Sequence, residues 1–255
     1  MRVRGLLIDL EGVLYVGDKP VAGAREAIEG LKENNITFRF VSNTTRKCRR
    51  TIARKLATMG FEIPEKYIFT PPLAAIEYMK KNQLDRYYLL TTGDMDQDFE
   101  GIGLNDDAVQ ADCVILGDAG DAVTYGSLNH AFRQLMGGAE LIALERDRYW
   151  MAHDGLSLSA GPFVSGLEFA SGKNAIVVGK PSAAFFELAL QDMGLCADQV
   201  AMVGDDIITD IGGAQSAGIP GVLVRTGKFR GQDLACSEIT PWKTIGSIAD
   251  IREIL

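Results

Sequence analysis

The chain has 255 residues, 47% of them apolar and 24% charged, and its formal net charge is −8. That length can form one large domain, or a core domain with a second domain inserted into it. The sequence contains no run of eighteen apolar residues, so no membrane span is expected. Residues 80–178 hold 7 Lys and Arg against 15 Asp and Glu, and this acidic region argues against nucleic acid as a partner.

Cysteine usage and the first residues both favour a cytoplasmic protein. The cysteines are far apart and form no C-x-x-C pair, so we expect reduced thiols rather than a metal or disulfide framework. They are Cys48, Cys113, Cys196 and Cys236. Residues 1–4 lead directly into an apolar strand pattern, without the cleavage pattern of a signal peptide.

The first part of the chain alternates strand and helix patterns. Short apolar runs predict strands at residues 5–8, 37–42 and 67–70, the last of them stopped by Pro71 and Pro72. Apolar residues at helical spacing predict helices between these strands, at residues 24–31 and 48–59. This order predicts a parallel sheet with right-handed crossovers.

The last part of the chain continues in the same style, with strands predicted at residues 175–178, 200–203 and 221–224. The acidic middle has elements of its own: strands at residues 87–91, 113–116 and 141–144, and a helix at residues 127–136. We therefore predict an α/β protein. A Rossmann-like parallel-sheet core comprises residues 1–77 and 179–255, and an inserted α/β domain comprises residues 78–178.

Two carboxylates follow the first predicted strand. Asp9 and Glu11 are two residues apart, and ligands of parallel sheets bind beyond the carboxyl ends of the strands. Alternation along an extended chain points both side chains to the same side, and Gly12 allows the backbone to turn close to a ligand. Taken alone, the pair fits equally well an Asp that caps a helix and a Glu on a surface loop.

A second group of acids follows a later buried strand. Asp205, Asp206 and Asp210 lie within six positions, and so many carboxylates at a strand end are costly unless a cation joins them. If their strands are neighbours, Asp9 and Asp205 form an oxygen-rich site suited to Mg²⁺. The alternative is a purely structural role, in which Asp206 or Thr209 caps the helix that follows.

Two further segments carry groups that bind phosphate. Ser42 and Asn43 follow the second strand, and hydroxyl and backbone N–H groups at a helix start suit a phosphate. Lys180 follows another strand and offers a point charge to phosphate oxygens. Read separately, these are a helix cap and a surface lysine. Combined with the acids, they predict phosphoryl transfer with Asp9 as the nucleophile.

These segments resemble, in order, the four motifs of the haloacid dehalogenase superfamily: Asp9-x-Glu11-Gly12-Val13, Ser42-Asn43, Lys180-Pro181 and Gly204-Asp205-x-x-x-x-Asp210. The insertion between the second and third motifs resembles the large cap domain of the type IIA branch. Within that branch, several segments are similar to a subgroup of phosphatases that act on phospholysine, phosphohistidine and inorganic pyrophosphate. They are Gly161-Pro162-Phe163, Val178-Gly179-Lys180-Pro181, Gly212-Gly213-Ala214-Gln215 and Arg225-Thr226-Gly227-Lys228.

The resemblance implies a Mg²⁺-dependent phosphatase for a small phosphate ester, phosphoramidate or pyrophosphate, working through an aspartyl-phosphate on Asp9. It also implies a homodimer formed through the cap domain. The implied metal ligands are the Asp9 carboxylate, the backbone carbonyl of Glu11 and Asp205, with Asp210 in support. The implied phosphate-binding residues are Ser42, Asn43 and Lys180.

Glu11 departs from the family pattern, in which most phosphatases have Asp as general acid and base and the subgroup tends to have Ser. Glu keeps a titratable carboxylate but adds a methylene, and misplacement by about 1 Å can cost about 100-fold in rate. We hypothesise that Glu11 still protonates the leaving group. The alternatives are a phosphate-binding or regulatory protein with weakened catalysis, and a receiver-like protein, which a large insertion disfavours.

Other side chains are weaker candidates. His130 and His153 are expected to be packed, surface or turn residues, and Tyr149 and Trp150 to lie in the core of the inserted domain. Arg46 is expected to be solvated rather than to bind phosphate.

Overall fold

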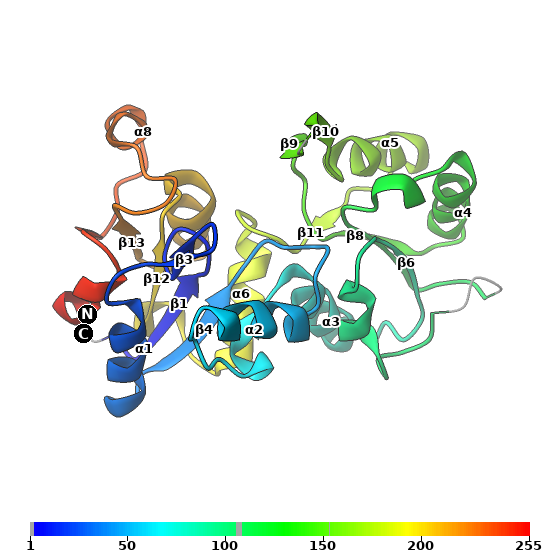
Figure 1. Cartoon of the computed structure of the whole chain (residues 1–255). Coiled ribbons are helices and arrows are strands. Elements are labelled where there is room, and N and C mark those ends of the chain that lie inside the picture. The colour runs from blue at the N-terminus through cyan, green and yellow to red at the C-terminus, as the bar shows by residue number, and fades with distance from the viewer. Residues whose placement is uncertain (1–2, 106–108, 153) are drawn as a thin grey trace. The chain divides into compact units, whose positions relative to one another are not determined.

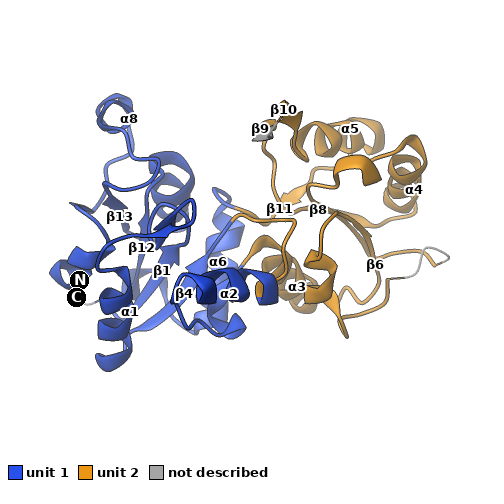
Figure 2. Ribbon diagram, viewed as in Figure 1, with its two compact units in different colours: residues 1–42, 50–69, 180–255 blue, residues 43–49, 70–179 orange. Residues whose placement is uncertain are grey.

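The computed structural model describes residues 3–105, 109–152 and 154–255 (Figure 1). His153 is therefore outside the described residues. The chain forms two compact units, coloured separately in Figure 2. Unit 1 comprises residues 1–42, 50–69 and 180–255, and unit 2 comprises residues 43–49 and 70–179. The predicted core and cap boundaries at residues 77/78 and 178/179, like the cap role of the inserted part, stay a prediction.

Unit 1 is built on a six-stranded parallel sheet in the order β14-β13-β12-β1-β4-β5. Its strands are β1 (Gly5–Asp9), β4 (Thr37–Val41), β5 (Ile68–Phe69), β12 (Val200–Gly204), β13 (Gly221–Val224) and β14 (Lys243–Ile245). Every residue of β1 and β12 is buried, because these inner strands are covered on both faces. That position explains why both segments read as continuous apolar runs.

The other elements of unit 1 are the helices α1 (Ala24–Glu33), α2 (Arg49–Thr58), α6 (Ala183–Met193), α7 (Gly213–Ser216) and α8 (Gly231–Cys236), a π-helix (Ile207–Gly212), 3₁₀ helices (Glu65–Tyr67, Ala197–Gln199 and Ile248–Ile254) and a short antiparallel pair, β2 (Tyr15–Val16) and β3 (Lys19–Pro20). Leu6 and Ile8 of β1 pack with α1, α2 and the C-terminal 3₁₀ helix in one apolar cluster. Leu7 points to the opposite face and is equally buried.

Unit 2 has its own four-stranded parallel sheet in the order β11-β8-β7-β6. The strands are β6 (Tyr87–Leu90), β7 (Cys113–Leu116), β8 (Glu140–Ala143) and β11 (Ile176–Val177), accompanied by α3 (Pro71–Asn82), α4 (Tyr125–Met136) and α5 (Gly161–Ser171). Two 3₁₀ helices (Met95–Phe99 and Gly120–Ala122) and an antiparallel hairpin, β9 (Tyr149–Ala152) with β10 (Gly155–Leu158), complete it.

The predicted α/β class with a parallel sheet is confirmed, and β5 ends before Pro71 and Pro72, as predicted. The two prolines also begin α3, where the missing N–H of proline has no helical partner to lose. Two local expectations are wrong. Ser42 and Asn43 do not lie at a helix start, because α2 begins at Arg49. Tyr149 and Trp150 are 54% and 37% exposed rather than core residues.

The late start of α2 has a cause that is distant in sequence. The backbone N–H of Cys48 donates to Asp94 Oδ1 at 2.9 Å, and that of Arg49 donates to Asp98 Oδ2 at 3.1 Å. These carboxylates satisfy amides that a helix start leaves unpaired, so the capping groups come from residues 94–98 and not from the segment after β4.

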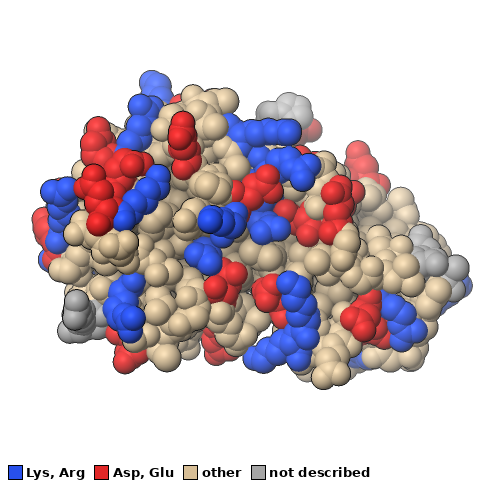
Figure 3. Space-filling view, turned by 90° about the horizontal axis from the view of Figure 1, so that it is seen from below, with Lys and Arg blue, Asp and Glu red and all other residues tan. Residues whose placement is uncertain are grey.

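Basic and acidic side chains lie interspersed on the face shown in Figure 3. Several acids form ion pairs within their own unit, such as Asp112 with Arg86 and Glu168 with Arg146, both at 2.6 Å. None of the four cysteines, all of which lie in the described part of the chain, forms a disulfide. Among the described residues, no helix has both the length and the apolar character that crossing a bilayer requires.

Candidate active site

The carboxyl ends of β1 and β12 bring the predicted acids together. The two strands are parallel neighbours, with Ile8 opposite Val203. Asp9 ends β1 and Asp205 follows β12, so both lie at the same edge of the sheet. Asp210, on the π-helix, completes a cluster of three buried carboxylates, each of which offers one oxygen within 4.8 Å of those offered by the other two.

Lys180 places a positive charge between two of these acids. Its Nζ lies 2.6 Å from Asp9 Oδ1 and 2.6 Å from Asp210 Oδ1. The Lys180 side chain is only 5% exposed, which excludes the interpretation of an ordinary surface lysine. The preceding strand β11 pairs with β8 in the sheet of unit 2, so Lys180 does not follow a strand of the six-stranded sheet.

Burial and crowding set the protonation of this cluster. Burial raises the pKa of Asp9 to about 7, Lys180 opposes that shift, and Asp210 and Asp205 add to it. Burial likewise raises the pKa of Asp205, against the backbone N–H of Lys228. Burial alone would lower the pKa of Lys180, but Asp210 and Asp9 outweigh it and the pKa is raised. The neighbouring lysines therefore do not fully compensate the burial of Asp9 and Asp205, and a further cation would favour the charged forms of these two carboxylates.

Asp205 is held by backbone groups on two sides. Its Oδ2 accepts a hydrogen bond from the backbone N–H of Lys228 at 2.6 Å. Gly12 and Gly227 both have a positive φ, of 91° and 62° respectively. An added Cβ would lie 1.9 Å from Asp205 Oδ2 at Gly12 and 2.1 Å from it at Gly227. Both positions thus require glycine for conformation and for space.

The neighbouring acids have distinct local roles. Asp206 Oδ1 accepts from the backbone N–H groups of Ile208 and Thr209, both at 2.9 Å, and so caps the π-helix. The predicted cap role is therefore confirmed for Asp206. Asp210 Oδ2 accepts from the Asp206 backbone N–H at 3.2 Å, which fixes the carboxylate whose other oxygen meets Lys180.

The remaining predicted residues have different surroundings. Ser42 comes directly after Val41, the residue paired with Asp9 across β1 and β4, so it follows the same sheet edge. The Glu11 side chain is exposed, and the buried carboxylate cluster consists of other residues. Asn43 belongs to unit 2, and its contact with a phosphate stays a prediction.

Arg46 is also part of unit 2 and is more constrained than the expected solvated side chain. Its Nη2 donates to Asp118 Oδ1 at 3.1 Å, and its guanidinium lies 4.9 Å from the ring centroid of Trp150. Asp118 lies in the loop that follows β7, so this arrangement belongs to the strand ends of the second sheet.

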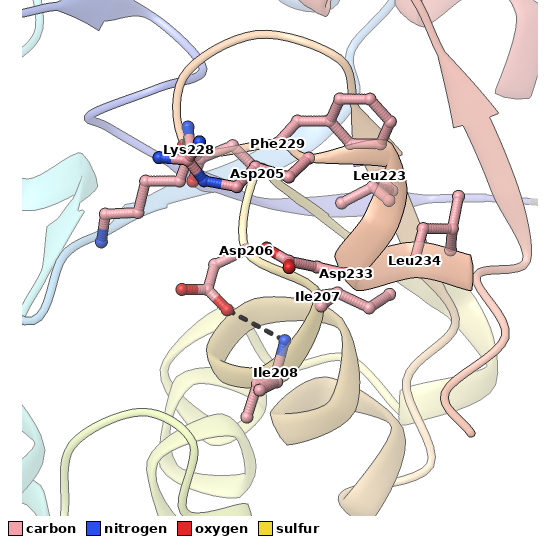
Figure 4. Close-up of a pocket in the computed structure, with 10 residues that line it drawn as sticks. Asp205, Asp206, Ile207, Ile208, Leu223, Lys228, Phe229, Asp233 and Leu234 are labelled. Carbon is pink, nitrogen blue, oxygen red and sulfur yellow. Dashed lines mark hydrogen bonds between the residues drawn. The ribbon is translucent and has the colours of Figure 1, made fainter. Parts of the chain in front are cut away.

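A pocket of about 330 Å³ adjoins Asp205 in unit 1 (Figure 4). One side is polar and carries Asp206, Lys228 and Asp233, and the other is formed by apolar side chains such as Leu223 and Phe229. Sequence reasoning assigned no role to Thr226 and Lys228, although the Thr-Gly-Lys segment after a buried strand was a visible signal. Their contacts join segments more than twenty residues apart, which no local pattern reveals.

Buried carboxylates around a lysine lie at the strand ends of a parallel α/β sheet, which is where α/β enzymes bind their ligands. Comparisons with known proteins assign the family. The model of haloacid dehalogenase-like hydrolases matches residues 6–105, and that of HAD-hydrolase-like proteins matches residues 177–251. The phospholysine phosphohistidine inorganic pyrophosphate phosphatase of Danio rerio is 40% identical over 237 residues, which cover 91% of this chain and 86% of that protein. The chain belongs to the haloacid dehalogenase-like hydrolase family.

Two further comparisons agree with this assignment. The human haloacid dehalogenase-like hydrolase domain-containing protein 2 is 40% identical, covering 91% of this chain and 87% of that protein. The crystal structure of a 4-nitrophenylphosphatase from Thermotoga maritima superposes with a TM-score of 0.87 at 28% identity, covering 99% of this chain and 98% of that one. The family resemblance inferred from the four motifs is confirmed, and with it the expectation of an enzyme of the haloacid dehalogenase phosphatase type.

Proposed function

We propose that this protein is a Mg²⁺-dependent phosphatase that hydrolyses a small phosphate ester, phosphoramidate or pyrophosphate through an aspartyl-phosphate on Asp9. The observation that carries the proposal is the buried cluster of Asp9, Asp205 and Asp210 with Lys180 between two of them. Relatives that are named phosphatases support the reaction class.

The donor set fits Mg²⁺ in its chemistry. The cluster offers only carboxylate oxygens, which this hard cation prefers, and the lack of a Cβ at Gly12 lets the backbone that follows Glu11 approach the Asp205 carboxylate closely. In our proposal, Asp9, Asp205 and the carbonyl of Glu11 hold the ion, with Asp210 in support. The ion supplies positive charge that offsets repulsion between the Asp9 carboxylate and an anionic phosphate.

The first chemical step uses Asp9 and Lys180. An Asp9 carboxylate oxygen attacks phosphorus and forms a new P–O bond, while the bond from phosphorus to the leaving group breaks. Lys180 holds Asp9 Oδ1 at 2.6 Å and so fixes the orientation of the nucleophile. Ser42 and Asn43 bind phosphate oxygens, and Glu11 donates a proton to the departing oxygen or nitrogen.

The second step returns the enzyme to its starting state. A water molecule attacks phosphorus, gives its proton to the Glu11 carboxylate, and the P–O bond to Asp9 breaks, releasing inorganic phosphate. The exposed position of Glu11 suits both tasks, because the leaving group and the water must reach it from solvent. The additional methylene of Glu affects only the side chain and leaves the backbone carbonyl of residue 11 available to the metal.

A phosphate-release screen with and without Mg²⁺ tests the proposal. The panel comprises phospholysine, phosphohistidine, pyrophosphate, sugar phosphates and nitrophenyl phosphate. We expect turnover of at least one compound that requires Mg²⁺ and that Asp9→Asn lowers by about 10³-fold or more, since removal of a nucleophile leaves only binding and electrostatic effects.

Circular dichroism of Asp9→Asn checks that its fold is retained. Turnover that survives in Asp9→Asn would refute the assigned nucleophile. Mg²⁺ binding without turnover of any compound would favour the alternative, a phosphate-binding or regulatory protein with weakened catalysis.

A further inference from the structure

The turn Thr226–Phe229 contacts both halves of the candidate metal site. The Thr226 Oγ1 donates a hydrogen bond to the backbone carbonyl oxygen of Gly12 at 2.5 Å. Two residues later, the backbone N–H of Lys228 donates to Asp205 Oδ2 at 2.6 Å. One short turn after β13 therefore holds the loop that follows β1 and the carboxylate that follows β12.

This turn and the Gly12 loop touch backbone to backbone. A Cβ on Gly227 would lie 2.4 Å from Gly12 Cα, so the two segments approach too closely for any side chain at position 227. Gly12 is fixed on its other side as well, because its N–H donates to the Tyr15 carbonyl oxygen at 2.7 Å. With both its N–H and its C=O bound, Gly12 has a defined backbone conformation, and that conformation orients the preceding carbonyl of Glu11.

The far end of the turn is anchored in an apolar cluster. The backbone N–H of Phe229 donates to the Thr226 carbonyl oxygen at 3.3 Å and closes the turn. The Phe229 ring packs against the cluster of Ile207, Ile211 and Leu223, on the apolar side of the pocket in Figure 4. Packing of Phe229 thus restricts the motion of the turn at one end, and the hydrogen bonds of Thr226 and Lys228 in turn restrict Gly12 and Asp205.

We propose that Thr226 is a positioning residue for Mg²⁺, which sets the Glu11 carbonyl through Gly12 while the adjoining Lys228 N–H sets Asp205. This inference rests on the proposed function, since it concerns the metal of that same site. The residue acts through others and does not touch the metal or substrate.

The reason for an effect on metal affinity is geometric. Mg²⁺ requires near-ideal octahedral ligand positions, and groups that orient its ligands change metal affinity or activity by about 10–100-fold when they are removed. Without the Thr226 hydroxyl, the carbonyl of the buried residue Gly12 loses this partner, and the loop samples orientations that do not bind the ion. Apparent affinity then falls in proportion to the population of the competent conformation.

The test is Mg²⁺ binding by isothermal titration calorimetry, which needs no substrate. Thr226→Val keeps the shape of the side chain and removes the hydroxyl, and we expect its Kd for Mg²⁺ to rise about 10-fold or more. Thr226→Ser retains a hydroxyl and is expected to stay within about 2-fold of the parent protein. Thr58→Val is the matched control, because Thr58 also donates to a backbone carbonyl, at 2.7 Å to Lys55, but lies exposed on α2.

The outcomes separate this inference from the proposed function. An unchanged Kd in a folded Thr226→Val protein would overturn the positioning role and leave Mg²⁺-dependent phosphatase activity untouched. Absence of Mg²⁺ binding by the parent protein would overturn both. If Thr226→Val does not fold, Thr226→Ala makes the same comparison without added bulk, and failure of both to fold would overturn the inference by showing a general structural need.

Discussion

Replacement of Lys180 by methionine tests the electrostatic balance of the site. Methionine keeps an unbranched apolar chain of similar length and removes the charge that lies 2.6 Å from both Asp9 and Asp210. The variant therefore leaves three buried carboxylates close together without the cation between two of them. We expect a large loss of stability in metal-free buffer.

The magnitude follows from the two contacts. At an effective dielectric constant of about 20, two unit charges 2.6 Å apart attract by about 6 kcal/mol, but burying each ion costs several kcal/mol. Removal of one partner from a buried ion pair costs about 3–5 kcal/mol in total. We expect about 3 kcal/mol at pH 8, the lower end, because Asp9 can relieve part of the penalty by taking up a proton.

The loss should be smaller at pH 5. Asp9 has a folded-state pKa of about 7, above its ordinary value of 3.8, so its proton favours the folded state at low pH and this benefit disappears as pH rises through 7. Without Lys180 the pKa of Asp9 rises further, because Lys180 lowers it. The Lys180 charge itself is fully present at both pH values, since its raised pKa lies far above them.

The assay must report on unit 1 alone, and the chain offers a convenient probe. Its two tryptophans are divided between the units, Trp242 in unit 1 and Trp150 in unit 2. Urea unfolding followed by Trp242 fluorescence in a Trp150→Phe background, with EDTA present, measures the relevant transition. Lys243→Met is the control, because Lys243 forms a largely exposed pair with Glu253 at 3.5 Å and such pairs contribute about 0–1 kcal/mol.

A loss for Lys180→Met no larger than that for Lys243→Met, in EDTA at pH 8, would refute the view that Lys180 offsets the buried carboxylates. A loss that is equal at pH 5 and pH 8 would refute the assigned protonation of Asp9.

Two further predictions concern Glu11 and the second unit. Glu11→Gln should lower kcat/KM for an alkyl phosphate by about 100-fold or more and affect nitrophenyl phosphate much less, because only the alkoxide is a leaving group poor enough to need a proton. Equal losses of kcat/KM for the two substrates in steady-state assays would exclude the general-acid role. Glu145 is 4% exposed and accepts hydrogen bonds from Ser159 Oγ at 2.5 Å, from the Ala160 N–H at 2.7 Å and from the Asp147 N–H. Because Glu145→Ala leaves these donors without their acceptor, it should lower the free energy of unfolding of unit 2 by about 2–4 kcal/mol. Urea unfolding followed by Trp150 fluorescence in a Trp242→Phe background measures this loss, and a change below 0.5 kcal/mol (about the usual limit for surface substitutions) would contradict it.

The sequence by itself determined the parallel α/β core and most of its strands, because strands buried on both faces must be continuous apolar runs. It also singled out Asp9 and Asp205, because acids directly after buried strands are placed at the edge where such sheets bind ligands. Asp210 and Lys180 were singled out by their place in the same set of motifs. The family followed from the order of these motifs.

Only the tertiary structure decided how these residues meet. It brought Asp9 beside Asp205 by pairing β1 with β12, placed Lys180 after a strand of the other sheet, and took the capping groups of α2 from Asp94 and Asp98. It also disclosed Thr226, whose partner Gly12 is 214 residues away. Hydrogen bonds between segments so far apart leave no periodic trace in a sequence, because periodicity records which face of an element is buried and not which element covers it.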